Sequence, residues 1–228
     1  MKKLLVVMIV VVAIALVSAG VAMAGISSTR HNLSSSASWT IRAAAGQTNE
    51  ICVFCHTPHN ANTGFLGAPL WNKTNSASVY TLYGTTVGGN TTATLGAISK
   101  ACLSCHDGSS AINSVVNAPG SGMGSGTVNM NGGTTVMPAG ATNLGTDLRN
   151  DHPVGITYDV TAPVEASLYG TATALTGSWV GAVTIADLLR NGQVECSSCH
   201  EPHSSQFAEF LRADNANGSK LCLGCHNK

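Results

Sequence analysis

The chain of 228 residues has few aromatic and few charged side chains, and both shortages limit what it can be. Aromatic residues make up 5% of it and charged residues 10%, against roughly 25% charged residues in typical soluble domains. The length suits one or two small domains, yet the side chains alone are poorly suited to an ordinary hydrophobic core. The 11 lysines and arginines are spread out, so we expect no nucleic-acid partner, which would require a basic patch.

Long apolar runs are also missing, except at the N-terminus. Met1-Lys2-Lys3 reads as the charged start of a secretory signal, Leu4–Val17 as its apolar segment and Ala22-Met23-Ala24 as its cleavage site. The apolar segment is shorter than the ~20 residues of a membrane span, which favours a cleaved signal over a retained anchor. We therefore expect residues 1–24 to be a signal peptide. The remaining chain should be secreted, extracellular or at the cell surface, with the periplasm as the alternative, and without a transmembrane segment.

No cysteine lies outside four copies of one motif, Cys-x-x-Cys-His, which also contain half of the eight histidines. The copies are Cys52-Val-Phe-Cys55-His56, Cys102-Leu-Ser-Cys105-His106, Cys196-Ser-Ser-Cys199-His200 and Cys222-Leu-Gly-Cys225-His226. This motif is the attachment signature of c-type haem, in which both thiols bond to the porphyrin and the histidine binds the iron. Disulfides or zinc sites are the alternatives, but neither explains a histidine after every cysteine pair. The motifs predict four covalently attached haems.

The other four histidines recur in matched contexts. His31 and His152 each stand alone before the motifs, whereas His59 and His203 each complete Cys-x-x-Cys-His-x-Pro-His. Four haem irons need four further ligands, so we expect these histidines to be the second metal ligands. An ordinary surface histidine is the alternative for any one of them, but the matched count and positions favour ligation. The competing methionines cluster in one glycine-rich segment and have no partner in the repeat.

The repeat predicts two dihaem modules after the signal peptide. Module 1 covers 25–145, with an insertion near 60–100 and a glycine-rich loop at 120–145, and module 2 covers 146–228. The expected fold is a mostly irregular multihaem cytochrome c, with a few short helices at the haem motifs, haems as its core and little β structure. The glycine-rich loop either wraps haems or a neighbouring subunit, or is a surface insertion.

The spacing of His56 and His59 restricts which haem each can bind. They are three residues apart, too close to bind opposite faces of one iron, and Pro58 disfavours helix before it. His59 must therefore ligate a different haem, which brings two haems close together. The simplest assignment gives His59 to the Cys102/Cys105 haem, His203 to the Cys222/Cys225 haem, His31 to the Cys52/Cys55 haem and His152 to the Cys196/Cys199 haem. Ligation between modules or subunits satisfies the same count.

Two histidines on each iron leave no position for a substrate. Such a protein transfers electrons, and imidazole in place of a methionine thioether lowers the reduction potential. We therefore expect an electron-transfer protein without an open catalytic haem, and not an enzyme.

Several motifs also carry a family resemblance. They are His31-Asn-Leu-Ser, Cys-Val-Phe-Cys-His-Thr-Pro-His at 52–59, His152-Pro-Val-Gly and the doubled module at 196–226. Their order and number resemble the tetrahaem extracellular cytochrome filaments of metal-reducing bacteria, the OmcE-type nanowire family, over most of 25–228. The resemblance implies a homopolymer whose haems form one stack, between upstream redox proteins and external electron acceptors. It also implies that one distal histidine ligates a haem of the neighbouring subunit, and His31, near the new N-terminus, is the expected residue.

Other classes of protein stay open, since fold does not decide function. A monomeric periplasmic tetrahaem shuttle would have lysines around an exposed haem edge, whereas the basic residues here are sparse. A multihaem reductase would leave one iron open, and a structural filament would use its haems mainly for folding. Replacing a distal histidine would alter the assembly of a structural filament without altering long-range conduction.

Overall fold

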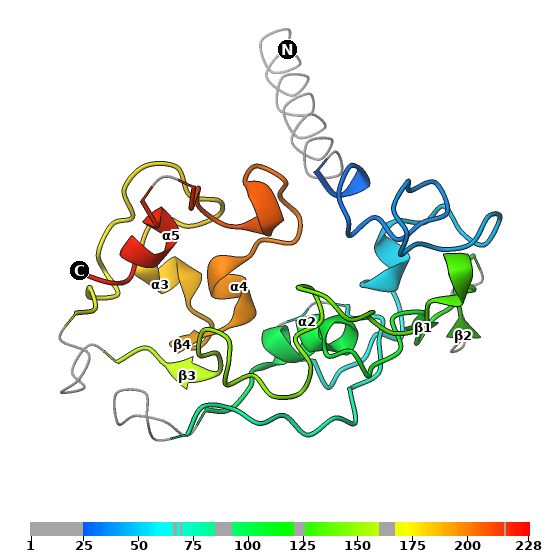
Figure 1. Ribbon diagram of the computed structural model, residues 1–228, viewed down its shortest axis with the longest axis horizontal. Helices are drawn as coiled ribbons and strands as arrows, with labels where there is room; N and C mark the ends of the chain where they lie inside the picture. Colours follow the sequence, from blue (N-terminus) through cyan, green and yellow to red (C-terminus); the bar gives the residue numbers. More distant parts are fainter. Residues whose placement is uncertain are drawn as a thin grey trace, which may run out of the picture.

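The structure is a computed structural model that describes residues 25–65, 68, 70–84, 93–120, 126–159, 167–216 and 218–228. The expected signal peptide at 1–24 lies outside these residues. Most of the described chain is irregular, with short helices and little strand, which confirms the predicted fold class. The second half of the chain, with α3, α4 and α5, lies beside the first half, with α2 near the centre (Figure 1).

Helices occur at all four Cys-x-x-Cys-His motifs, as the sequence predicts. These four are η1 (Cys52–Phe54), α2 (Ala97–His106), α4 (Cys196–Cys199) and α5 (Lys220–Leu223). Further helical segments are η2 (Asn131–Gly133), α3 (Ile185–Leu188) and η3 (Ala208–Phe210). At ten residues α2 is the longest of them, so the motifs are held mainly by packing rather than by helix propensity.

Two small antiparallel sheets are the regular β structure of the described residues. Strand β1 (Ser114–Val115) pairs with β2 (Gly126–Thr127), and β3 (Ile156–Thr157) pairs with β4 (Gln193–Val194). The second sheet joins the segment after His152 to the segment before the third motif. Each pairing covers two residues a strand, too little to be stable without the surrounding packing.

Buried apolar side chains form small separate clusters. One contains Ala43, Val53, Phe54, Ile112, Val128 and Met130; the others contain Phe65, Ala68 and Ala101, and Leu95, Leu103 and Leu148. Cys55 and Cys105 pack against the first of these clusters, so the first two Cys-x-x-Cys-His motifs border one patch of core. The clusters agree with the shortage of aromatic residues; haems as the main core stay a prediction.

A buried carboxylate joins α2 to α4. Glu195 precedes α4 and is 1% exposed. Its Oε1 accepts the backbone N–H of Gly96 at 2.9 Å, and its Oε2 accepts the hydroxyl of Ser99. Ser99 in turn accepts the backbone N–H of Cys196 at 3.0 Å. The carboxylate thus caps the positive N-terminal end of α2 and fixes the second motif against the third.

The described part of the glycine-rich loop, residues 126–145, packs on the protein rather than projecting from it. Val128 and Met130 are buried, and Met130 forms an isolated β-bridge with Ala43. Farther along, the N–H of Leu144 donates to the carbonyl of His106 at 2.8 Å. This segment therefore connects the first cluster to the end of α2.

Gly155, in the repeated context that begins at His152, occupies a position where a side chain does not fit. Its φ of +72° lies in the left-handed region, and a Cβ would stand 2.7 Å from the carbonyl oxygen of Thr94. Its carbonyl accepts the N–H of Thr94, and its own N–H donates to Val194. Glycine here lets three segments meet beside His152.

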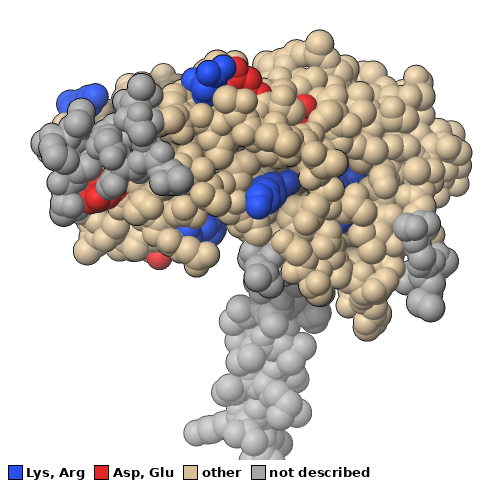
Figure 2. All heavy atoms as spheres, turned by 90° about the horizontal axis from the view of Figure 1, so that it is seen from below, with Lys and Arg blue, Asp and Glu red and all other residues tan. Residues whose placement is uncertain are grey.

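Charged side chains are sparse and scattered on the face seen in Figure 2, where no broad basic patch gathers. In the described part of the chain, no helix has the length and hydrophobicity needed to cross a membrane.

Candidate functional site

Each Cys-x-x-Cys-His motif closes on itself as a single helical turn. The backbone N–H of the motif histidine donates to the carbonyl of the first cysteine in three copies, for His56 at 2.8 Å, His200 at 3.0 Å and His226 at 2.9 Å. In the remaining copy, His106 ends α2. One turn puts both cysteines on the same side of the backbone, as attachment to one porphyrin edge requires. All eight cysteines are free thiols.

The second and third motifs meet at their first cysteines. The thiols of Cys102 and Cys196 share a hydrogen bond, and this bond, with burial, raises the pKa of Cys102. The meeting point lies beside the Glu195 cap, since Cys196 also donates its N–H to Ser99. The two halves of the repeat therefore join at the first cysteines of the second and third motifs.

Cysteines of the first and second motifs, and of the third and fourth, are also neighbours. Burial, followed by the neighbouring Cys105, raises the pKa of Cys55 to about 12. Burial, followed by Cys225, raises the pKa of Cys199 to about 11. The four motifs are thus adjacent in the order in which they occur along the chain.

Six of the eight histidines form three pairs of neighbouring rings, one stacked and two edge-to-face. His31 lies 6.1 Å from His106, His56 lies 6.0 Å from His203, and His152 lies 6.4 Å from His226, measured between ring centroids. Each pair joins one motif histidine to one histidine outside the motifs. This is the combination predicted for the two ligands of one haem iron.

The separations suit a metal ion between the rings. Two metal–imidazole bonds of about 2.0–2.1 Å, plus about 1.1 Å from each Nε2 to its ring centroid, sum to about 6.3 Å. Contact between rings without a metal allows about 4.5–7 Å, so distance alone does not identify the pairs. The pairing pattern is more specific, because a motif histidine meets a histidine outside the motifs in all three pairs.

Hydrogen bonds at Nδ1 orient four of the eight rings. The partners of Nδ1 are the carbonyls of Thr142 for His106 at 2.8 Å, Pro153 for His152 at 3.0 Å and Glu209 for His200 at 2.9 Å, and the carboxylate of Glu201 for His203 at 3.0 Å. An Nδ1–H donated to an oxygen leaves Nε2 as the metal-binding atom, as in most histidine metal sites. Together with the pairs, these contacts show that the residues fit haem iron.

Two of the three buried side-chain polar atoms without a hydrogen-bond partner in the described residues lie beside the motifs; the third is Oδ1 of Asn117. The indole N–H of Trp71 is buried without a hydrogen-bond partner. The ring centroid of Trp71 lies 5.7 Å from that of His56. The hydroxyl of Ser197, between the cysteines of the third motif, is likewise unpaired. A bound group with acceptor atoms would satisfy such donors, which agrees with cofactor sites at these positions.

The observed pairs differ from the simplest sequence-based assignment. His31 meets His106 rather than the first motif, His203 meets His56 rather than the fourth, and His152 meets His226 rather than the third. The reason is that the N-terminal segment packs across the second half of the chain. The ring of His31 stacks on Phe210 at 4.3 Å, and Gly25 lies against the backbone of His203.

The environment of His31 favours the neutral ring. Burial, followed by the nearby His106, lowers its pKa to about 4. Neutral imidazole is the form that binds a metal ion, so His31 is ready for ligation at neutral pH.

Two histidines remain outside these pairs. The rings of His59 and His200 are exposed, and neither contacts another histidine ring in the part of the chain that the structure describes. The backbone of His59 is nevertheless fixed, because its carbonyl accepts Thr57 Oγ1 and Asn117 Nδ2, both at 3.0 Å. His59 is a non-motif histidine and His200 a motif histidine, so together they have the composition of a fourth pair.

A strained turn supports both His31 and His200. Glu209 and Phe210 have φ of +56° and +60°, a region that costs about 1–2 kcal/mol for a residue with a side chain. The turn directs the carbonyl of Glu209 at His200 and the ring of Phe210 at His31. Strain of this kind persists where the surroundings over-determine it, often at functional sites.

Asp107, directly after His106, was not identified from the sequence. It is 2% exposed, and its carboxylate accepts hydrogen bonds from Ser76, Ser78, Tyr80, Ser109 and Ser110. Burial would raise its pKa, but the hydrogen bonds from Ser110, Ser109 and Tyr80 hold the pKa well below its usual value. An ionised carboxylate therefore organises the chain at the end of α2. An aspartate after the motif carries no signal that would predict this.

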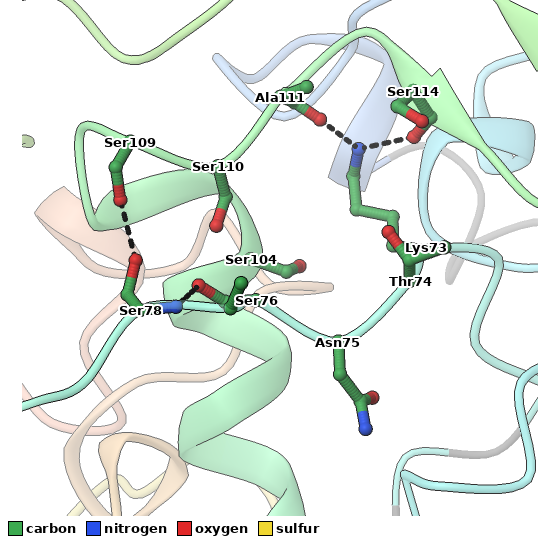
Figure 3. Close-up of a pocket in the computed structure, with 11 residues that line it drawn as sticks. Lys73, Thr74, Asn75, Ser76, Ser78, Ser104, Ser109, Ser110, Ala111 and Ser114 are labelled. Atoms are coloured by element: carbon green, nitrogen blue, oxygen red, sulfur yellow. Dashed lines mark hydrogen bonds between the residues drawn. The ribbon is translucent and has the colours of Figure 1, made fainter.

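A polar pocket of about 440 Å³ lies beside this network, between segments 73–78 and 109–114 (Figure 3). The buried ammonium of Lys73 donates to the carbonyls of Ala111 at 3.3 Å, Ile112 at 2.9 Å and Ser114 at 3.0 Å. Across the pocket, Ser78 and Ser109 hydrogen bond at 2.7 Å. Lys73 thus stabilises the loop after α2 and does not point its charge at a ligand.

The family model of the doubled CXXCH motif matches residues 189–228, and no curated protein matches the chain. The matched residues contain the third and fourth motifs with α4 and α5. Over this region the doubled motif indicates a multihaem c-type cytochrome module, with covalently attached c-type haem and an electron-transfer role.

Proposed function

We propose that the protein is a tetrahaem electron-transfer cytochrome whose subunits assemble into an extracellular conductive filament. The observation that carries the proposal is the set of histidine contacts: three pairs within one chain, and one exposed histidine of each kind left over. A subunit with one spare ligand and one incomplete site can be completed by its neighbours.

The chain would hold its haems through four cysteine pairs and eight histidines. The ligand pairs are His56 with His203, His106 with His31, His226 with His152, and His200 with His59 of the adjacent subunit. When bound, c-type haem supplies a one-electron iron couple. Histidine on both sides leaves no position for a substrate, so the residues favour electron transfer over catalysis.

The order of the motifs supports conduction along the chain. Cys55 neighbours Cys105, Cys102 hydrogen bonds to Cys196, and Cys199 neighbours Cys225. Groups attached at adjacent cysteines are themselves neighbours, so the four haems would follow one another from first to fourth motif. Ligation of the His200 site by the next subunit would extend this series across the subunit boundary.

The sequence-based expectation gave the contact between subunits to His31. Because His31 lies against His106 and Phe210 of its own chain, we assign that contact to His59 instead. The exposed ring of His59 on a fixed backbone suits a ligand presented to another molecule. The contact would be heterologous, since it joins two different surfaces, and such contacts generate rings or open filaments.

His59→Ala tests this assignment, with His31→Ala as the matched control. His59→Ala should leave the three pairs within the chain intact but prevent assembly, leaving one haem per chain that binds added cyanide. His31→Ala should open the His106 site, yet leave the junction between subunits able to form. Electron microscopy and cyanide titration of the haem-loaded chains measure both effects. Assembly of His59→Ala to wild-type length would contradict the assignment.

Secretion, the upstream redox protein and the external electron acceptor belong to the same proposal. They are supported by the apolar N-terminal segment and by the resemblance of the motif order to extracellular cytochrome filaments. The alternative is a monomeric periplasmic shuttle, which requires all four irons to be ligated within one chain.

A further inference from the structure

The two copies of Cys-x-x-Cys-His-x-Pro-His differ at the residue between the histidines, which is Thr57 in the first copy and Glu201 in the second. Thr57 is buried, and its hydroxyl donates to the backbone carbonyl of His59. Glu201 instead reaches a ring: its Oε1 accepts Nδ1 of His203 at 3.0 Å. The second copy therefore puts a carboxylate on a proposed iron ligand, and the first does not.

The carboxylate of Glu201 is fixed in place by a buried arginine. Oε2 accepts Nη2 of Arg212 at 2.9 Å, and the side chain of Arg212 is 3% exposed. Arg212 is itself held by the carbonyls of Ser197 and Val180, each at 2.7 Å. The backbone N–H of His203 donates to Oε1 as well, at 3.3 Å. The contact with the His203 ring is thus prearranged by the fold.

The partner of His203 differs in charge from those of the other oriented rings. His106, His152 and His200 place Nδ1 against neutral backbone carbonyls. A carboxylate accepts the Nδ1 proton more strongly than a carbonyl does, and it makes Nε2 a more basic metal ligand. A more basic ligand stabilises the ferric over the ferrous state of an iron that it binds.

We propose that Glu201 is a positioning residue that lowers the reduction potential of the haem held by His56 and His203. The proposal rests on the proposed function, because it takes this pair as the two ligands of one haem. The haem of the first motif would then have its potential set from the second half of the chain, since Glu201, His203 and Arg212 all belong to that half.

The test compares Glu201→Gln and Glu201→Thr with the wild-type haem-loaded chain. Gln keeps the size and an acceptor oxygen but removes the charge, and Thr is the residue of the first copy. The control is Asp147→Asn, which removes an exposed carboxylate that pairs with Arg149 rather than with a histidine. A spectroscopic redox titration measures the potentials, and electron paramagnetic resonance of the oxidised protein reports the ligand field of each ferric site.

The expected result for both Glu201 variants is a rise of one haem's potential, with three unchanged. The reduction potential should rise by at least about 59 mV, which is a tenfold change in the one-electron equilibrium constant. The electron paramagnetic resonance g-values of one ferric site should also change. Asp147→Asn should titrate as the wild type. Four unchanged potentials in a fully loaded Glu201→Gln chain would overturn the proposal. Loss of a haem in both variants would also overturn it, because Glu201 would then act in assembly.

Failure of the proposed function would be detected separately. The mass of the wild-type chain counts its haems before any variant is made, and fewer than four would contradict the tetrahaem assignment. The redox titration of the Glu201 variants measures this effect whether or not the subunits polymerise, since His56 and His203 belong to one chain.

Discussion

Ser99 on α2 and Glu195 before α4 hydrogen bond to each other across 96 residues of sequence. This contact joins the second motif to the third, because the same carboxylate caps α2 and Ser99 accepts the N–H of Cys196. Two halves of a repeat that share little regular structure are thus fixed to one another beside the first cysteines of the second and third motifs.

Replacing Glu195 by Ala should destabilise the protein. It would leave Gly96 N–H and the Ser99 hydroxyl buried without their acceptor, and hydrogen bonds to charged groups contribute about 1.5–3 kcal/mol. Chemical denaturation of the haem-loaded chain followed by circular dichroism measures the loss. Asp147→Ala, an exposed control, should change the free energy of unfolding by less than about 0.5 kcal/mol. Equal stability of the two variants would contradict the role given to Glu195.

Gly155→Ala should also destabilise the protein, by about 2–4 kcal/mol, because it combines left-handed backbone strain with overpacking. The new Cβ would meet the carbonyl of Thr94, and the shift should reach His152 and alter the absorption spectrum of its site. Gly46→Ala is the matched control, with φ of +76° and no atom within 4 Å of its Cβ. An equal loss in the free energy of unfolding for both variants would contradict a contribution from close packing at Gly155.

Lys73→Met should lower the free energy of unfolding by about 1.5–3 kcal/mol, because three carbonyls lose a charged donor. Those carbonyls belong to the loop that follows α2, between Ala111 and Ser114. Lys100→Met on the exposed side of α2 is the control and should have little effect. Thermal denaturation of the two variants checks the difference, and a Lys73→Met variant as stable as the control would refute it.

Asp187 should make part of the stability sensitive to acid. Hydrogen bonds from the backbone N–H groups of Thr184 and Val183 lower its pKa below the ordinary value of 3.8. Its contribution is therefore complete above about pH 4 and is lost as the pH falls further. In Asp187→Asn the urea midpoint should fall less between pH 7 and pH 3 than in the wild type. Asp151→Asn, at another exposed aspartate, serves as the control; identical pH dependence in all three proteins would contradict this prediction.

Much of the local structure could be predicted from the sequence. Covalent spacing fixes the Cys-x-x-Cys-His turns, and the shortage of aromatic and charged side chains indicates an irregular chain with small clusters. The structure places His56 beside His203, and the absence of a shared iron between His56 and His59 stays a prediction.

The pairing of histidines could not be predicted, because it depends on packing between distant segments. His31 is brought to His106 by the stacking of its ring on Phe210 and by the position of Gly25 against His203. Nothing in the spacing of the motifs encodes these contacts. The difference between Thr57 and Glu201, by contrast, is visible in the sequence, but its meaning depends on where the Glu201 carboxylate points.

Cryo-electron microscopy of the haem-loaded protein collected from outside the cell tests whether the subunits form a conductive filament. We expect filaments in which haems follow one another without a break, with His59 of one subunit opposite His200 of the next. Discrete particles in which all four irons are ligated within a single chain would contradict it and identify a soluble shuttle.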